Sequence, residues 1–530
     1  MKRSSSSRPR LRQRVVSALC AASLGIPVAL SPLAAQAASN QLPALGDTAG
    51  EDFSVGAERK VGDQIMREIR RDPDYSDDPV LLEYLQGIFQ PLVAAARQRG
   101  EIGPDLDQRF AWEPFLVRDR SVNAFALPGG FIGVHLGLMG MTSTRDELAS
   151  VLAHELSHIT QRHIARGVAN SKRQSLIGIA ATILGVLAAS RSNSTDGAQA
   201  IIASGQAASI QGQLNFSRDM EREADRIGFG VMTTAGFAPG GMAAMFEKLS
   251  QSSRLNDYGA YPYLRSHPLT TERIGEARAR LGTAQSVPPV SVLEHVAAQA
   301  RARVLADPRA DQLRRWQARD AESGSANVAD KLSAAYESAL ASTLMRDWAR
   351  ADASLSKALA LVQGSPRSDA RAERAVVLLV VQSALERGDT ARAERALKPY
   401  AMEPSRPVTL LNGRLTLASG AGESGLKTTA EDLQTWVSGH PHDAEAWSLL
   451  GQVWSKLGQR LRALRAEAES RVALGDLTGA VDRLRAGQRL AHGGPGMGID
   501  FIEASVIDAR LRDIEAQRRE LAADERRSGG

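Results

Sequence analysis

Residues 154–158 read HELSH, within a stretch whose apolar residues recur at helical spacing. On a helix, His154 and His158 share one face and lie about 6 Å apart along the axis. Two imidazoles placed in this way can bind one Zn²⁺ ion, and Glu155, one step round the helix, can reach a water molecule without being a ligand. Because such a pentapeptide also occurs by chance, the interpretation needs a second signal.

The second signal is the segment SRDMEREADRIG at 217–228. Glu221 and Asp225 share a helix face, so one can bind the metal while the other orients a ligand or assists proton transfer. Glu223 points elsewhere, either as a surface residue or as the partner of a nearby Arg. Without the first motif, this helix would be an ordinary charged solvent face. Together the two motifs predict a three-ligand metal site.

A histidine third ligand of the metzincin kind is rejected. That class needs Gly and His where this chain has Gln161 and Ile164. His163 lies about 140° round the helix from His158, which makes it a poor ligand. A glutamate is the better third ligand.

The segments around these motifs predict a mainly α domain with a small sheet. Helical spacing extends over 53–99 around a Pro/Asp turn at 72–79, and it returns from 145 to about 189. Further helices are expected around 220–234 and 240–250, and this region ends near Leu281.

Residues 110–138 are rich in β-branched and aromatic residues, and they predict two short strands around the Pro-Gly-Gly turn at 128–130. The first strand either offers an exposed edge on which an extended substrate adds, or belongs to a purely structural hairpin. The residues of that edge are Asn123, Ala124, Phe125 and Ala126.

The segment 176–189 is nearly all apolar, but it is too short to span a bilayer. It is either a buried hairpin helix or a segment that dips into a membrane or touches a membrane partner.

Beyond a linker and connecting helix at 283–327, short helical units recur over 328–495. Asp347, Asp389 and Asp476 begin similar pieces in successive helix pairs, and 443–458 follows the tetratricopeptide pattern most closely. An α-solenoid of such pairs is expected, with a generic helical bundle as the alternative. Residues 496–530 predict a charged C-terminal helix, which we interpret as a solvated cap.

The N-terminus predicts a secretory signal peptide at 1–37. Six basic residues precede an apolar stretch at 15–30 and an Ala-x-Ala site ending at Ala37. The alternative is an uncleaved anchor. The formal charge of +5 comes from these basic residues, so the remainder is nearly neutral and nucleic acid is not implied. The one cysteine, Cys20, lies inside the signal, which excludes thiolate chemistry in the mature chain.

The HELSH helix, the 221–225 helix and the SHPL run at 266–269 together resemble the HtpX and CAAX-protease superfamily of zinc peptidases. The similarity covers roughly 53–281, and it implies a zincin-like α+β metallopeptidase domain of residues 38–282. It implies one Zn²⁺ per chain, held by His154, His158 and Glu221, with Glu155 as general base and Asp225 as a second acidic active-site residue. His267 is either a further ligand that keeps the enzyme latent or a histidine in a surface turn.

A signal peptide and a repeat region narrow the resemblance to periplasmic endopeptidases that degrade misassembled outer-membrane proteins and assist their assembly. Unfolded outer-membrane proteins and the assembly machinery, reached through the repeats, are the implied partners. Peripheral membrane contact is also considered. Two alternatives are a repeat-based chaperone with a mostly latched metal site, and a peptide-processing metallopeptidase without a role in assembly.

Overall fold

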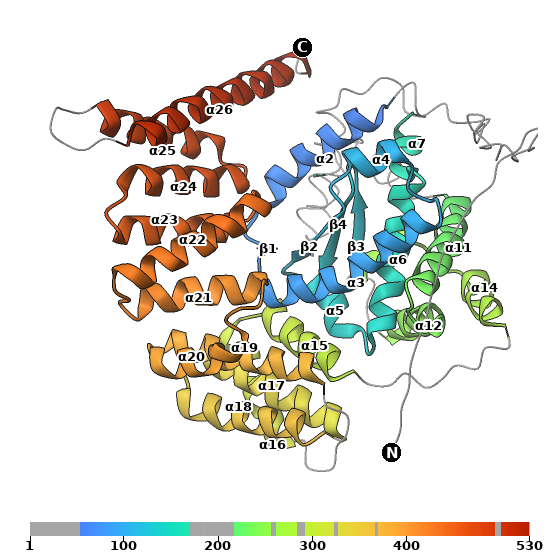
Figure 1. Ribbon diagram of the computed structural model, residues 1–530. Helices are drawn as coiled ribbons and strands as arrows, with labels where there is room; N and C mark the ends of the chain where they lie inside the picture. Colours follow the sequence, from blue (N-terminus) through green and yellow to red (C-terminus); the bar gives the residue numbers. More distant parts are fainter. Residues whose placement is uncertain are drawn as a thin grey trace, which may run out of the picture. The chain divides into compact units, whose positions relative to one another are not determined.

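The chain is mainly helical with one small sheet, as the sequence predicts (Figure 1). The computed structural model describes residues 53–169, 184, 217–255, 261–282, 292–322, 327–365, 369–492 and 500–528. The predicted signal peptide and most of the apolar segment 176–189 lie outside these residues. Leu184, the one described residue of that segment, is partly buried against a hydrophobic cluster around Ile65 and Phe115.

The first part of the chain holds ten described helices around the sheet. These are α2 (Val55–Ile69), α3 (Pro79–Gln98), α4 (Pro104–Arg109), α5 (Leu136–Met141), α6 (Arg145–Thr160), α7 (His163–Ala169), α11 (Arg218–Thr234), α12 (Gly240–Leu255), α13 (Pro262–Ser266) and α14 (Thr271–Leu281). The two helices that carry the motifs begin at side-chain caps: Thr144 accepts from the N–H of Glu147, and Ser217 accepts from that of Met220.

The sheet has the strand order β1-β2-β4-β3. The strands are β1 (Tyr75–Ser76), β2 (Glu113–Val117), β3 (Ala124–Leu127) and β4 (Phe131–His135). β3 and β4 form the predicted antiparallel hairpin, whose turn needs the positive φ angles of Gly129 and Gly130. β2 joins β4 in parallel, and β1, which lies in the predicted turn, pairs with β2 antiparallel. Among the strands of the described residues, β3 therefore lies at one edge of the sheet.

Helix α6 lies in the middle of this part of the chain. It packs against β3 on one side and against α11 on another (Figure 1), and every residue from Glu147 to Thr160 is buried. Gly228 lets α11 approach closely, because a Cβ atom there would lie 3.0 Å from the carbonyl oxygen of Ala153 and 3.1 Å from the backbone nitrogen of His154. The helix that carries HELSH is thus held by packing on several sides.

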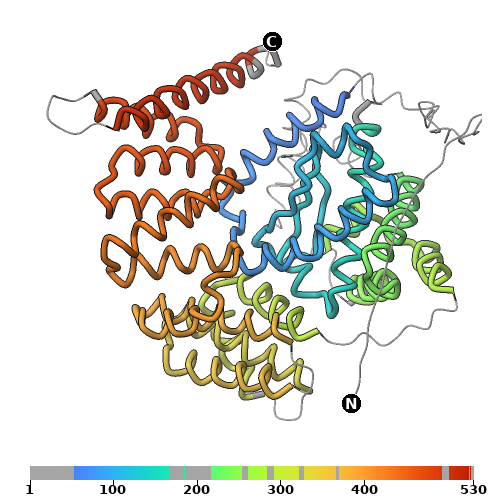
Figure 2. Tube along the Cα trace, viewed as in Figure 1, coloured from blue at the N-terminus to red at the C-terminus, as the bar shows by residue number. Residues whose placement is uncertain are grey.

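The second part of the chain is a solenoid of helices, which Figure 2 follows as a tube. Its elements are α15 (Leu293–Ala306), α16 (Ala310–Glu322), α17 (Val328–Leu344), α18 (Trp348–Gln363), α19 (Ala370–Glu386), α20 (Thr390–Leu397), η2 (Lys398–Tyr400), α21 (Arg406–Ala418), α22 (Glu423–Gly439), α23 (Ala444–Lys456), α24 (Arg460–Ala473), α25 (Leu477–His492) and α26 (Phe501–Ser528). Each of α17, α23, α24 and α25 packs against the next helix.

The recurring aspartates mark the starts of helices. Asp347 and Asp389 are the N-cap residues of α18 and α20, and Asp476 accepts from the N–H of Gly479 at the start of α25. The predicted connecting segment contains two helices, α15 and α16, where we expected one. Pro308, which lacks an N–H and restricts the residue before it, separates them.

Arginines of α15, α19 and α21 bind acidic residues around the start of α3. The pairs are Arg301 with Asp78, Arg374 with Glu83 and Arg406 with Asp77. Arg301 is 4% exposed and donates to both carboxylate oxygens of Asp78, at 2.8 and 2.6 Å. Two-point bonding fixes orientation as well as distance, so this pair ties the start of α3 to α15.

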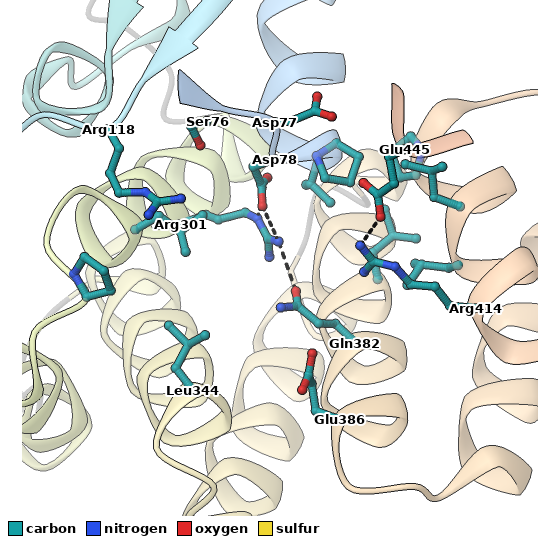
Figure 3. A pocket seen from close by; sticks show the side chains of 18 residues that line it. Ser76, Asp77, Asp78, Arg118, Arg301, Leu344, Gln382, Glu386, Arg414 and Glu445 are labelled. Atoms are coloured by element: carbon teal, nitrogen blue, oxygen red, sulfur yellow. Dashed lines mark hydrogen bonds and ion pairs between the residues drawn. The ribbon is translucent and has the colours of Figure 1, made fainter. Parts of the chain in front are cut away.

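Beside these pairs lies a cavity of about 490 Å³. Figure 3 shows Arg301 between Asp78 and Gln382, with further lining side chains from the repeat helices. Among the described helices, none has the length and apolarity needed to cross a bilayer.

Candidate metal centre

Four buried side chains bring their donor atoms together. His154, His158, Glu221 and His267 each offer one atom to a group in which all atoms lie within 4.8 Å of one another. The Nε2 atoms of His154 and His158 are 3.0 Å apart. Glu221 Oε2 lies 3.6 Å from His154 Nε2, and its Oε1 lies 3.4 Å from His158 Nε2. The two predicted helices therefore supply three donors to one point.

The chemistry of this donor set fits a metal ion. Imidazole nitrogens and a carboxylate that converge on one point are the usual ligands of zinc and related transition metals. Burial alone would raise the pKa of Glu221, but the neighbouring His267, His158 and His154 hold it well below its usual range. Glu221 is thus an ionised carboxylate facing several imidazoles, as a cation site requires.

Glu155 is placed differently from the donors. It is fully buried, and neither of its carboxylate oxygens has a hydrogen-bond partner among the described residues. His267 Nε2 lies 3.5 Å from Glu155 Oε1. Buried polar atoms normally have hydrogen-bond partners, so a buried carboxylate without one beside the donor cluster is a candidate reactive group.

Asp225 lies behind His154. Its Oδ1 is 2.9 Å from His154 Nδ1, and Arg273 binds both of its oxygens, at 2.7 and 2.8 Å. Burial alone would raise the pKa of Asp225, but the hydrogen bonds from Arg273 and His154 lower it to about 2. An ionised carboxylate on Nδ1 leaves Nε2 of His154 free to face the cluster.

Arg273 of α14 was not found from the sequence. It also lies 2.7 Å from Glu221 Oε2, so one guanidinium holds both acidic residues of α11. Tyr263 was missed as well, and its ring stacks on His267 at 4.7 Å between centroids. The only available signal was that both flank the SHPL run, Tyr263 three residues before Ser266 and Arg273 four after Leu269.

His267 belongs to the cluster and is not a residue of a surface turn. It is 2% exposed, and its Nδ1 lies 3.0 Å from Glu221 Oε1. Burial lowers the pKa of His267, but the charges of Glu155 and Glu221 outweigh that effect and raise it above the ordinary value.

His163 is not a donor of the cluster, as expected, but it is not remote from it. The 140° estimate assumed a continuous helix, whereas α6 ends at Thr160 and Arg162 has a φ angle of 52°. The chain turns there, and α7 begins with His163 beside His158. Glu223 pairs with Arg166, which agrees with one of the two predicted roles.

The predicted substrate edge lies on the outside of the sheet. β3 pairs with β4 on one side, and no other strand in the described part of the chain pairs with it. Asn123, just before β3, is 5% exposed, and its side-chain oxygen has no hydrogen-bond partner among the described residues. The edge therefore carries a buried acceptor that this part of the chain does not satisfy.

Comparison with known proteins agrees with this arrangement. Residues 83–281 match peptidase family M48. The chain is 29% identical to the beta-barrel assembly-enhancing protease of Yersinia pestis over 84% of this chain and 87% of that protein. A Vibrio cholerae relative of that type is 38% identical over 52% of this chain, and the alignment spans only 54% of the relative. The mitochondrial metalloendopeptidase OMA1 of Saccharomyces cerevisiae is 30% identical over 36% of this chain and 53% of that protein.

The fold, the buried donor cluster and the match of residues 83–281 to peptidase family M48 define a metalloprotease. Over most of its length, the chain is similar to beta-barrel assembly-enhancing proteases.

Proposed function

We propose that the chain is a periplasmic zinc endopeptidase that degrades misassembled outer-membrane proteins and assists their assembly. The donor cluster carries the proposal, with His154, His158 and Glu221 as the residues that hold the metal. Zinc, when bound, lowers the pKa of water and polarises the scissile carbonyl. The names of the relatives support the role in β-barrel assembly, and the basic, apolar and Ala-x-Ala sequence of residues 1–37 supports export.

Glu155 is the general base in this proposal. Its unengaged carboxylate can take a proton from the attacking water and deliver it to the leaving amine. Asp225, held by Arg273, keeps His154 in one orientation and one tautomer. This geometry supports an orienting role for Asp225 more directly than a role as proton donor.

The edge of β3 is the proposed place for an extended substrate. A peptide laid along Ala124–Leu127 would add a strand to the sheet, next to the buried helix α6. Segments that failed to form a barrel are extended and have unpaired backbone groups, so they suit such an edge.

The cavity beside the Arg301 and Asp78 pair is a second proposed contact for clients. Leucines and prolines from α3, α15, α17, α19 and α21 contribute to its walls. Arg118 and Glu386, which also line it, form no ion pair in the described part of the chain (Figure 3). An extended segment with apolar and charged side chains would find both kinds of partner there.

Replacement of Glu155 by Gln tests the catalytic assignment. The amide cannot act as a base, so hydrolysis of an unfolded outer-membrane protein should fall by at least about 100-fold while bound zinc stays at one per chain. Proteolysis assays and metal analysis of the purified variant measure both. Cleavage at the wild-type rate would refute the assignment.

A second candidate function is a chaperone with a latched metal site, and the burial of His267 in the cluster favours it. The Glu155→Gln variant distinguishes this function from the proposed one. If Glu155→Gln abolishes degradation but cells still assemble outer-membrane proteins normally, the chaperone role is the principal one. Loss of both would make proteolysis the principal role.

His267 is the proposed latch. Its imidazole contacts Glu221 and faces Glu155, where it competes with water and substrate. His267→Ala should therefore raise the rate of client cleavage several-fold, measured at equal zinc content. A rate at or below that of the wild type would remove the latch from the proposal.

A further inference from the structure

The two histidines of HELSH are supported from behind in different ways. His154 Nδ1 contacts a carboxylate directly, that of Asp225 at 2.9 Å. At His158 the corresponding neighbour is another imidazole: Nδ1 of His163 lies 2.8 Å from Nδ1 of His158. His163 is 1% exposed, so its contacts are protected from water.

The contacts continue from His163 to a carboxylate. His163 Nε2 lies 3.0 Å from Glu223 Oε2, and Arg166 Nη1 lies 3.1 Å from the same oxygen. Helix α11 therefore presents Glu221 to the donor cluster and Glu223 to His163, which lies behind His158.

One arrangement of hydrogens satisfies this series. A nitrogen-to-nitrogen hydrogen bond needs one donor and one acceptor. If His158 presents Nε2 to the metal, its Nδ1 carries the hydrogen and donates to Nδ1 of His163. Nε2 of His163 then carries a hydrogen and donates to the Glu223 carboxylate, which Arg166 holds in place.

We propose that His163 and Glu223 are positioning residues that fix the orientation and tautomer of His158 through the series His158, His163 and Glu223. This inference rests on the proposed function in one respect, that His158 binds the metal. Neither residue touches the substrate or the reacting atoms in the proposal. Their effect is on how tightly the ion is held.

The test measures metal binding by the full chain. His163→Phe keeps an aromatic ring but removes both nitrogens, whereas His163→Asn keeps an acceptor near the position of Nδ1. Glu223→Ala removes the end of the series. The matched control is Arg222→Ala. Arg222 is the neighbour of Glu223 on the same helix, and the substitution removes its exposed ion pair with Glu272.

Competition with a chromogenic chelator gives the dissociation constant for Zn²⁺, and the visible spectrum of the Co²⁺-loaded protein reports ligand geometry. His163→Phe and Glu223→Ala should weaken zinc binding roughly 10- to 100-fold and shift the Co²⁺ bands. His163→Asn keeps the acceptor for His158 but loses the contact with Glu223, so it should weaken zinc binding less than His163→Phe does, and Arg222→Ala should match the wild type.

His158→Ala is the reference variant: it distinguishes failure of the proposed metal ligands from failure of the positioning role of His163 and Glu223. If it leaves zinc affinity unchanged, the ligand set fails and the inference with it. If it weakens binding while His163→Phe and Glu223→Ala do not, the inference alone is overturned. Should His163→Phe fail to fold by circular dichroism, the half-buried Glu223 decides, and unchanged affinity in Glu223→Ala overturns the inference.

Discussion

The metal centre and the helical repeats are built from contacts of opposite kinds. In the centre, buried polar side chains meet across long stretches of chain: His154 contacts Asp225, 71 positions away, and His267, 113 positions away. In the repeats after α15, the helices pack mainly on their neighbours in sequence, and aspartates cap the starts of several of them. A substitution in the metal centre should therefore destabilise the whole centre, whereas a substitution in the repeats should destabilise only the helices next to it.

The largest expected effect concerns Arg273. Arg273→Leu leaves Asp225 and Glu221 without their shared cation inside the protein, so it should lower the free energy of unfolding by about 3–5 kcal/mol. Urea unfolding measures the change. Arg278→Leu on the same helix removes an exposed pair with Glu247 and should cost less than about 1 kcal/mol. Equal losses of unfolding free energy in Arg273→Leu and Arg278→Leu would contradict the special role given to the buried contacts of the centre.

The next largest expected effect is a pH dependence of stability on the side of the metal centre, in the turn that follows α6. Glu58 of α2 pairs with Arg162 in the turn after α6, and burial raises the pKa of Glu58 from 4.5 to about 7, against the effect of Arg162. The folded state then binds the proton more tightly than the unfolded state, so this contribution is present below pH 4.5 and is lost as the pH rises through 7.

The sign can be checked by thermal unfolding of wild type and Glu58→Gln between pH 4.5 and 8. The wild type should lose stability over this range relative to the variant, by at most about 3 kcal/mol. Parallel curves for the two proteins would show that Glu58 does not titrate there.

The smallest effect belongs to the repeats. Asp476→Ala removes the acceptor for the N–H of Gly479 at the start of α25 and should cost about 1 kcal/mol. Asp482→Ala, on the exposed face of the same helix, is the control and should change little. Hydrogen exchange should show the loss of protection in α25 and its neighbours only. Loss of protection in α6 would contradict local failure.

The sequence was most informative where function depends on regular local geometry. The spacing of His154 and His158, and that of Glu221 and Asp225, defines a face of a helix without any knowledge of the fold. The Pro-Gly-Gly turn likewise predicted the hairpin, because it needs backbone angles that glycine provides. The similar pieces that begin at Asp347, Asp389 and Asp476 predicted successive helix pairs, and the structure adds that these aspartates cap the starts of helices.

Long-range partners could not be predicted in this way. Nothing local shows that Arg273 would bind both acidic residues of α11, or that β2 would join β4 in parallel. His163 was misplaced for a different reason, since its position was computed on a helix that in fact ends at Thr160. Tertiary packing decides each of these.

Gly228 has no side chain, yet it determines how closely α11 can approach α6, and so it affects every residue of the centre. A methyl group there would press on the backbone of Ala153 and His154, so α11 would have to retreat by a few tenths of an ångström. Such a shift would leave each donor present but carry Glu221, Asp225 and Glu223 away from their partners together. A mutational screen restricted to the polar residues would therefore miss Gly228, which fixes their distances from one another. To transfer this centre to another scaffold, the separation of the two helices must be reproduced together with the donor residues.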